Sequence, residues 1–444
     1  MGFSERFLAV CSVVLGICCA SIAAGCSHQG LAPAVIPQAP AVGPGPTIVH
    51  RIGADSSSYQ VLYAFGSSGA NGLIPESSLI NVKGTLWGTT ALGGAYGNGT
   101  ASGGTVFSIS ATGTEQVLHS FGAGSDGSKP FGGLIDVRGT LYGTTLAGGT
   151  YNKGTVFSIS TTGTEQVRHS FAGGSDGSNP YAGLLNVNGT LYGTTANGGT
   201  YGGGTVFSIS SRGKEHVLYS FGRNPYGAIG PGGNLIDVNG TLYGTAGGGT
   251  GNYCTGGCGT VFSISTSGKE HVLYNFGGPP DGEFPGYGLV DVNGVLFGTT
   301  NSGGTHRCFT YFPGYCGTIF SVTTGGTEHV IYSFGSSLND GSYPQASLID
   351  VKGTLYGTTE HGGAYWHGTG YSPGGTVFRI KPNGKREHVL HSFGSGTDGV
   401  SPSTALIDVN GKLYGTTPEG GGMLAPCSGF GVVGGCGTVF ALSL

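Results

Sequence analysis

The side chains best suited to acid–base chemistry lie close together near residue 360. Glu360 and His361 are adjacent in the sequence, and His367 follows six residues later. A carboxylate beside an imidazole could take up and release a proton, so these three residues are the catalytic candidates. The sequence has no nucleophile-elbow motif with a partner that can be placed, no phosphate-binding loop and no dinucleotide fingerprint. Enzymatic activity is therefore uncertain, with the balance against it, and we expect no cofactor and no metal.

Six cysteines outside the N-terminal segment form three local couples. The second cysteine of each couple directly precedes a Gly-Thr-Val-Phe-like motif. An even number of cysteines in an exported protein favours disulfides. Metal binding, with His306 near Cys308, is the alternative, but zinc normally takes four ligands and no loop supplies them. The expected disulfides are Cys254–Cys258, Cys308–Cys316 and Cys427–Cys436.

Aromatic residues are the main candidates for ligand binding. They lie in segments that otherwise consist mostly of Gly, Ser and Thr. Exposed aromatic rings on such a surface suit stacking against sugar rings, peptides or other flat ligands. The alternative is that each ring packs against its own loop. The candidates are Tyr151, Tyr201, Tyr253, Tyr311, Tyr315, Tyr365, Trp366, Tyr371, Tyr181, Tyr287 and Tyr343.

All these residues fall in the gaps of a phrase that the chain repeats seven times. A Tyr-Gly-Thr-Thr-like tetrapeptide is followed by a Gly-rich gap, by Gly-Thr-Val-Phe and by a run that ends in Ser-Phe. A period of roughly 50 to 59 residues indicates one structural unit stacked on copies of itself. Each copy holds four strand-like segments, which in one copy are 134–137, 140–145, 155–160 and 166–171. We name them A, B, C and D. Asn-Gly pairs between A and B, such as Asn188-Gly189, predict tight hairpins because both positions need a positive φ.

Seven units of four antiparallel strands predict an all-β protein, a seven-bladed β-propeller with four-stranded blades. The repeat region opens with a lone D strand at 59–65 and closes with a lone C strand at 438–443. We expect these two strands to pair, which closes the ring and removes two open sheet edges. A linear β-solenoid is the alternative, but it would leave those edges bare and require capping repeats.

The connections between the strands differ in length. The A–B and C–D turns are short and nearly constant, whereas the B–C and D–A loops are long and variable. Alternating strand direction places both long loops on one face of the propeller. A rigid scaffold usually carries its function on such loops, so we expect the binding surface there.

Three repeated features are interpreted as structural. Asp-Gly pairs in the D–A loops, such as Asp126-Gly127, predict turns, because Asp bonds its own backbone and Gly accepts a positive φ. A D-strand position that accepts His or Tyr, as at His119 and Tyr274, indicates packing. The Gly of Tyr-Gly-Thr-Thr is expected where a neighbouring blade comes close. The fourth copy reads Gly244-Thr245-Ala246, so we expect its blade to be irregular.

The first 58 residues indicate targeting rather than fold. Residues 1–25 resemble a secretory signal peptide, which ends in small residues before Cys26. This pattern predicts a bacterial lipoprotein with Cys26 as the lipid attachment residue. An ordinary signal peptide or a retained membrane anchor are the alternatives. Residues 26–58 are rich in Pro and Ala, as is typical of a flexible tether, which leaves the propeller at 59–444.

Composition narrows the range of partners. Only 9% of the 444 residues are charged, and the net charge is -4. A near-neutral surface argues against nucleic acid, which needs a basic stripe, and against a disordered polyelectrolyte. The expected partners are the membrane, through the N-terminal lipid, and a glycan or another extracellular macromolecule. We expect a monomer.

The repeated phrase resembles the GloVer (Gloeo/Verruco) tandem repeat. The resemblance rests on Val-Leu-Tyr-Ser-Phe-Gly, Asp-Gly-x-x-Pro, Leu-Ile-Asp-Val-x-Gly, Leu-Tyr-Gly-Thr-Thr and Gly-Thr-Val-Phe in order, across residues 59–444. It implies a bacterial surface or exported protein and no particular activity. We therefore expect a lipid-anchored cell-surface propeller that acts as a binding or adhesion module through its long loops. A propeller enzyme acting on polysaccharide, as a lyase or hydrolase, and a purely structural envelope protein are the alternatives.

Overall fold

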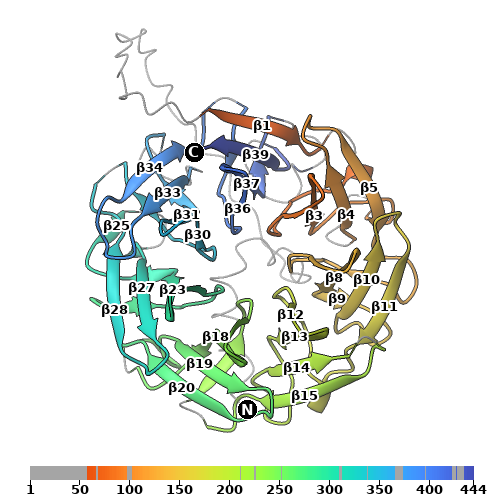
Figure 1. The fold of residues 1–444 in the computed structure, drawn as a ribbon, viewed down its shortest axis with the longest axis horizontal. Coiled ribbons are helices and arrows are strands. Elements are labelled where there is room, and N and C mark those ends of the chain that lie inside the picture. The colour runs from red at the N-terminus through yellow and green to blue at the C-terminus, as the bar shows by residue number, and fades with distance from the viewer. Residues whose placement is uncertain are drawn as a thin grey trace, which may run out of the picture. The chain divides into compact units, whose positions relative to one another are not determined.

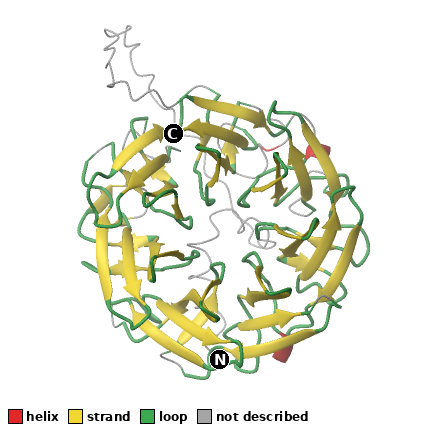
Figure 2. Ribbon diagram, viewed as in Figure 1, coloured by secondary structure: helices red, strands yellow, loops and turns green. Residues whose placement is uncertain are grey.

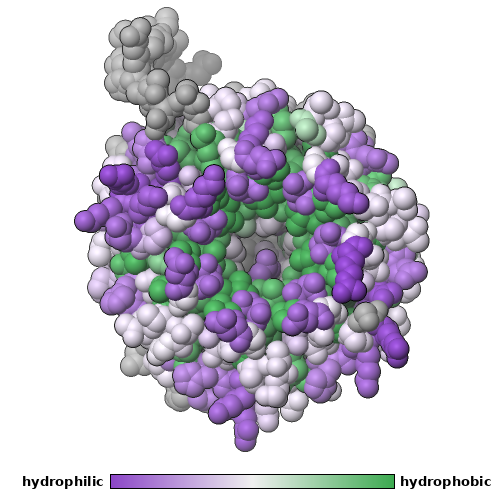
Figure 3. Space-filling view, viewed as in Figure 1, coloured by the Kyte–Doolittle hydropathy of each residue, from purple (hydrophilic) through white to green (hydrophobic). Residues whose placement is uncertain are grey.

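The computed structural model describes residues 58–444, except 67–68, 98–102, 211, 225–226, 252, 310–312, 338, 366–373, 396, 423–426 and 428–434. The expected signal peptide, Cys26 and the tether up to residue 57 lie outside the described residues. From Ser58 onward the chain forms one compact unit, in which seven four-stranded blades form a ring (Figure 1). The space-filling view shows a hollow at the centre of this ring, which we call the channel (Figure 3). The predicted all-β, seven-bladed propeller is confirmed.

Within each blade the strands run antiparallel in the order A, B, C and D, with A next to the channel and D outermost (Figure 1). In this order, blade one consists of β2 (Ile80–Val82), β3 (Thr85–Thr90), β4 (Thr105–Ile109) and β5 (Glu115–Ser120); blade two of β7 (Ile135–Val137), β8 (Thr140–Thr145), β10 (Thr155–Ser160) and β11 (Glu165–Ser170); blade three of β12 (Leu185–Val187), β13 (Thr190–Thr195), β14 (Thr205–Ile209) and β15 (Glu215–Ser220); and blade four of β17 (Ile236–Val238), β18 (Thr241–Gly248), β19 (Thr260–Ser265) and β20 (Glu270–Asn275). Blade five consists of β22 (Val290–Val292), β23 (Val295–Thr300), β27 (Thr318–Thr323) and β28 (Glu328–Ser333); blade six of β30 (Ile349–Asp350), β31 (Leu355–Thr359), β33 (Thr376–Ile380) and β34 (His388–Ser392); and blade seven of β36 (Ile407–Val409), β37 (Lys412–Thr417), β39 (Thr438–Ser443) and β1 (Tyr59–Ala64).

The remaining elements are short and lie in the loops. Two 3-10 helices, η1 (Gly69–Asn71) and η2 (Gly174–Asp176), are the helical segments of the described residues (Figure 2). No helix in this part of the chain has the length and apolarity to cross a membrane. The short loop strands are β6 (Gly127–Ser128), β9 (Ala147–Gly148), β16 (Ala228–Pro231), β21 (Gly282–Glu283), β24 (Ser302–Gly303), β25 (Arg307–Phe309), β26 (Pro313–Tyr315), β29 (Gly341–Ser342), β32 (His361–Gly362), β35 (Gly399–Val400) and β38 (Glu419–Gly420).

The ring closes as the sequence predicts. Strand β1 pairs antiparallel with β39, and Val61 lies opposite Phe440. The seventh blade thus takes its D strand from the beginning of the propeller and its other three strands from the end. Every blade has a complete set of four strands, so no C strand is left as a bare edge.

The core between blades is built on a repeated pair of phenylalanines. The Phe that follows each D strand meets the C-strand Phe of the next blade edge to face, with ring centroids 4.9 to 5.2 Å apart. These rings are almost completely buried. Edge-to-face contact is a favoured arrangement of aromatic rings. The pairs are Phe65–Phe107, Phe121–Phe157, Phe171–Phe207, Phe221–Phe262, Phe276–Phe320, Phe334–Phe378 and Phe393–Phe440.

Two glycine interpretations are corrected by the structure. A Cβ at Gly193 would lie 2.6 Å from the Phe207 ring and 2.9 Å from Leu184, and both residues belong to the same blade as Gly193. The expectation that a neighbouring blade requires this glycine is therefore wrong. At Asp126-Gly127 the Asp126 Oδ1 accepts a bond from Gly127 N at 2.7 Å, as a turn requires. Gly127, however, has no positive φ, and a side chain there would collide with Thr145, whereas Gly177 of the Asp176-Gly177 pair does have the expected positive φ.

Blade four is irregular, as expected. An additional strand, β16, pairs with β18, so this sheet has five strands. The other blades join two threonines across strands B and C, as Thr195 Oγ1 and Thr205 Oγ1 do at 2.8 Å. Ala246 stands at the first of these positions in blade four and cannot form that bond, while β18 continues to Gly248.

Candidate functional site

The two long loops of a blade lie side by side on one face. Short strands from the D–A loop pair with short strands from the B–C loop that follows it in the chain. These pairs are β6–β9, β21–β24, β29–β32 and β35–β38. The expected loop face therefore exists, and two zones on it carry the candidate residues. One zone follows the outer edge of the ring, and the other surrounds the channel.

A row of exposed tyrosines forms the outer zone, which we call the tyrosine rim. Four copies carry Tyr at the same place, two residues after a Gly-Gly pair of the B–C loop, and in blade four Tyr253 lies two residues further on. Between 42% and 61% of each side chain is exposed. The tyrosine rim consists of Tyr96, Tyr151, Tyr201, Tyr253 and Tyr365.

Hydrogen bonds fix the tyrosine rim at the outer edge. The backbone N–H of the residue before Tyr96 donates to Ser120 Oγ at 3.1 Å, and the residue before Tyr151 bonds Ser170 in the same way at 3.2 Å. Ser120 and Ser170 end D strands, which are outermost in their blades. The sequence analysis included the other four tyrosines but missed Tyr96, although Gly93-Gly94-Ala95-Tyr96 repeats the pattern of Gly148-Gly149-Thr150-Tyr151.

The other aromatic candidates are not part of the tyrosine rim. Tyr181 stacks on Phe131 with centroids 5.2 Å apart, and burial raises the pKa of Tyr287 well above its usual value. Tyr343 contacts His361 edge to face. Tyr315 is covered by its own loop, because the Arg307 guanidinium lies 5.2 Å from the ring centroid. Tyr311, Trp366 and Tyr371 lie outside the described residues.

The inner zone is the end of each D–A loop, beside the innermost strands. A proline recurs in each loop, and the residue after it always lies four positions before the A strand. This residue varies between copies, whereas the scaffold around it is constant. The seven residues are Glu76, Phe131, Tyr181, Gly232, Gly286, Gln345 and Ser403. Together with Glu360 and Glu419, we call them the channel mouth.

Three carboxylates of the channel mouth influence one another. Burial raises the pKa of Glu76 to about 8, and the negative charges of Glu419 and Glu360 add to this rise. Glu76 therefore holds a proton at neutral pH. Glu419 is almost fully buried. The sequence analysis missed Glu76 and Glu419 because neither belongs to a recognised motif, although the copies differ at both positions.

Two of the three catalytic candidates lie at this mouth. His361 Nε2 is 3.9 Å from Glu360 Oε2, and the side chains are 21% and 26% exposed. Gln345 donates its amide N–H to Glu360, which holds the carboxylate in place. His367 lies outside the described residues. The structure thus brings Glu360 and His361 together with Glu76, which was not expected.

A third polar arrangement recurs at the blade junctions, where the outer ends of adjacent blades meet. Here the D-strand His or Tyr bonds the Asp of the following loop. Examples are Tyr274 Oη to Asp281 and Tyr332 Oη to Asp340, both at 2.9 Å. The expected packing position is therefore a hydrogen-bonding position that either ring can fill. His119, His169 and His391 bond Asp126, Asp176 and Asp398 at 2.9 to 3.1 Å.

A glutamate from the next D strand completes most blade junctions. Burial raises the pKa of Glu165, Glu215, Glu328 and Glu387 to about 7, with nearby Asp charges adding to the rise. At the last junction Tyr59 stands in the place of the glutamate and stacks on His391.

The three expected disulfides are present, and each closes one B–C loop: Cys254–Cys258, Cys308–Cys316 and Cys427–Cys436.

The family model described as Gloeobacter/Verrucomicrobia repeat matches residues 99–312 and 313–444. No match was found among curated proteins. Similar solved structures have low sequence identity and TM-scores below 0.5, so no property of theirs is transferred to this chain.

Three of these structures are two enzymes and one surface component of a secretion system. A luciferin-regenerating enzyme is 13% identical over 69% of this chain and 88% of its own, with a TM-score of 0.40. PorZ, a surface component of the type-IX secretion system of Porphyromonas gingivalis, is 14% identical over 86% of this chain and 48% of its own, with a TM-score of 0.48. An oligogalacturonate lyase in complex with manganese is 10% identical over 78% and 86%, with a TM-score of 0.45.

Proposed function

The chain belongs to the Gloeobacter/Verrucomicrobia repeat family, and from this premise we propose that it is an exported binding module whose loop face holds a glycan. Three disulfides support export, because such bonds persist in oxidising compartments. In this proposal Cys26 carries a lipid that anchors the monomeric propeller to the cell envelope. The observation that carries the proposal is the tyrosine rim, in which rings recur at matching positions with about half of each side chain exposed.

The chemistry of the tyrosine rim suits a polymeric glycan. An exposed aromatic ring that is held by its loop can stack on the apolar face of a sugar at little cost in side-chain entropy. Five rings spaced around one edge can engage several sugar units of one polymer, which raises avidity without strengthening any single contact. The near-neutral surface adds no strong charge preference.

A glycan array followed by titration tests the tyrosine rim. We expect Tyr151→Ala/Tyr201→Ala to weaken binding about 5- to 150-fold, since each ring contributes about 0.5–1.5 kcal/mol. The matched control is Tyr151→Phe/Tyr201→Phe, which keeps both stacking surfaces and should bind within about threefold of the wild type. Absence of binding to any glycan would support the structural-protein alternative. Unchanged affinity in the alanine variant would show that the glycan binds outside the tyrosine rim.

The channel mouth supports a second candidate function, a hydrolase or lyase acting on polysaccharide. The observation in its favour is that Glu76 keeps a proton at neutral pH beside the carboxylates of Glu360 and Glu419. Neighbouring carboxyl groups with different proton affinities are the arrangement that acid–base catalysis requires. Glu76 would act as the acid, while Glu360 or His361 would accept a proton.

Release of oligosaccharides from a polysaccharide tests this candidate. We expect activity to fall as the pH rises through about 8, where Glu76 loses its proton. Glu76→Gln should lower the rate at pH 7 by about 100-fold or more, the usual contribution of an acid catalyst. Glu387→Gln is the control, because it changes another glutamate with a raised pKa that lies far from the mouth, in an outer blade junction. Activity that persists in Glu76→Gln would eliminate this mechanism.

A further inference from the structure

We propose that two blade junctions, His119–Asp126–Glu165 and His169–Asp176–Glu215, each bind a divalent transition-metal ion such as Zn²⁺. One potential ligand atom from each residue lies within 4.8 Å of the other two in both clusters. The sequence analysis expected no metal, since it considered only ligands that lie close together in one loop. This inference is independent of the proposed glycan binding.

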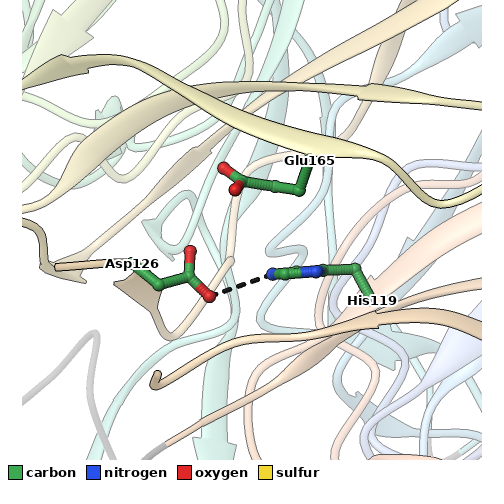
Figure 4. A group of neighbouring side chains, drawn as sticks. All are labelled: His119, Asp126 and Glu165. Atoms are coloured by element: carbon green, nitrogen blue, oxygen red, sulfur yellow. Dashed lines mark hydrogen bonds and ion pairs between the residues drawn. The ribbon is translucent and has the colours of Figure 1, made fainter. Parts of the chain in front are cut away.

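The three ligands of a cluster come from two adjacent blades. His119 lies on β5, Asp126 in the loop that follows it, and Glu165 at the start of β11 in the next blade. Figure 4 shows the three side chains pointing toward one another, with the imidazole bonded to the aspartate. The His119 Nε2 to Asp126 Oδ2 distance is 2.9 Å, and the equivalent distance in the second cluster is 3.1 Å.

The spacing is close to what a zinc site requires. Zinc lies about 2.0–2.2 Å from nitrogen and oxygen ligands, so ligand atoms around a tetrahedral ion are roughly 3.3–3.5 Å apart. The imidazole and aspartate atoms are 2.9 and 3.1 Å apart in the two clusters, so they would have to separate by a few tenths of an ångström to hold the ion between them. The glutamate ligand atom lies within 4.8 Å of the other two, so it would have to move inward to complete the site. One imidazole and two carboxylates are ligands that zinc and similar first-row ions accept.

Each cluster glutamate has one carboxylate oxygen without a partner. Among the described residues, Glu165 Oε1 and Glu215 Oε1 are buried and have no hydrogen-bond partner, as is also the case for the corresponding glutamate oxygen at three of the junctions that have Tyr in place of His. In each cluster a carboxylate oxygen of Asp126 or Asp176 lies within 4.8 Å of a carboxylate oxygen of the glutamate. A bound cation would satisfy the free oxygen and offset the repulsion between the two carboxylates.

Solvent can reach the second cluster. An open cavity of about 470 Å³ borders it and is lined by Ser175, Asp176, Thr200, Glu215, His216 and Tyr219. The imidazole and both carboxylates of the first cluster are likewise only partly buried. An ion can therefore enter with its remaining water ligands, and the three protein ligands leave a coordination position for water, as in open zinc sites.

Each of the other blade junctions lacks one of the three proposed metal-binding side chains. Four of them have Tyr where the clusters have His, and a phenol offers no ring nitrogen: Tyr63, Tyr219, Tyr274 and Tyr332. At the seventh junction His391 and Asp398 are present, but Tyr59 replaces the glutamate. The chain should therefore bind two ions, both of which join neighbouring blades.

Calorimetric titration of the metal-free full chain with Zn²⁺ tests the proposal. We expect about two ions per chain, and saturating Zn²⁺ should raise Tm by several degrees because it binds the folded state. His119→Tyr and His169→Tyr should each remove one site, and the double variant should bind none and lose the shift in Tm. Tyr occupies the same position in four other junctions, so these variants are expected to fold.

Two controls separate the clusters from other histidines. His391→Tyr and His271→Gln, which alter a junction without a glutamate and a solvent-exposed imidazole in another blade, should leave both sites intact. Glu165→Gln/Glu215→Gln provides a second double variant that should also abolish binding. The proposal is overturned if the wild type binds no Zn²⁺, or if the stoichiometry and the shift in Tm are unchanged in both double variants.

Discussion

A chain that begins at residue 66 is expected to lose the cooperative unfolding transition of a chain that begins at residue 57. The deletion removes β1, the fourth strand of blade seven, and leaves β39 as an open edge. It also removes Phe65, which contacts Phe107 in blade one, and Tyr59, which stacks on His391 in blade six. The deletion therefore breaks contacts to both neighbouring blades.

The expected loss is comparable to the whole stability of a domain. Removal of the fully buried Phe65 costs about 3–5 kcal/mol, and loss of the partly buried Tyr59 and of the β1 backbone pairing adds to this. Typical domains are stable by about 5–15 kcal/mol. Scanning calorimetry of the two chains measures the difference. A synthetic peptide of residues 57–66 added to the shorter chain should restore part of the transition, because it can pair with β39.

The control chain begins at residue 57 and retains β1. We expect this chain to unfold cooperatively. If the chain beginning at residue 66 unfolds within a few degrees of the control, closure by β1 does not hold the ring together.

The sequence predicted the scaffold well because the scaffold is what the copies share. Period, strand number and hairpin turns recur, and the lone strands at 59–65 and 438–443 allow one closed arrangement that leaves no open edge. The cysteine couples were equally clear, since each lies within one loop. The reason for Gly193 could not be read, because Phe207 and Leu184 reach it only after strands A, B and C have assembled.

The functional zones were predicted only in part, because their geometry depends on contacts between segments that are far apart in the sequence. The B–C tyrosines were identified, but their place at the outer edge depends on hydrogen bonds to the D-strand serines. Burial in the assembled ring raises the pKa of Glu76, and the charges of Glu419 and Glu360, from blades seven and six, add to the rise. The His–Asp–Glu clusters were missed because their members are seven and thirty-nine residues apart and belong to two blades. Because this D-strand position holds either His or Tyr, the sequence also suggested packing, although the imidazole nitrogen bonds the aspartate of the following loop.

Phe207→Ala is expected to lower the free energy of unfolding by about 3–5 kcal/mol. The ring is fully buried and meets Phe171 of the preceding blade at 5.2 Å, so its removal opens a cavity between blades two and three. Tyr201→Ala is the matched control, because it deletes an exposed ring six residues away and should change stability by no more than about 0.5 kcal/mol. Denaturant unfolding measures both changes.

A second substitution tests why Gly193 has no side chain. Gly193→Ala alone should cost about 1–3 kcal/mol, because its Cβ would lie 2.6 Å from the Phe207 ring. In Phe207→Ala that ring is absent and the new methyl group can occupy part of the cavity. The double variant should therefore be more stable than the sum of the two single changes predicts, by about 1–2 kcal/mol, within the range for residues in contact. Strictly additive losses would mean that Phe207 does not exclude a side chain at Gly193, and that the neighbouring blade must be reconsidered as the cause.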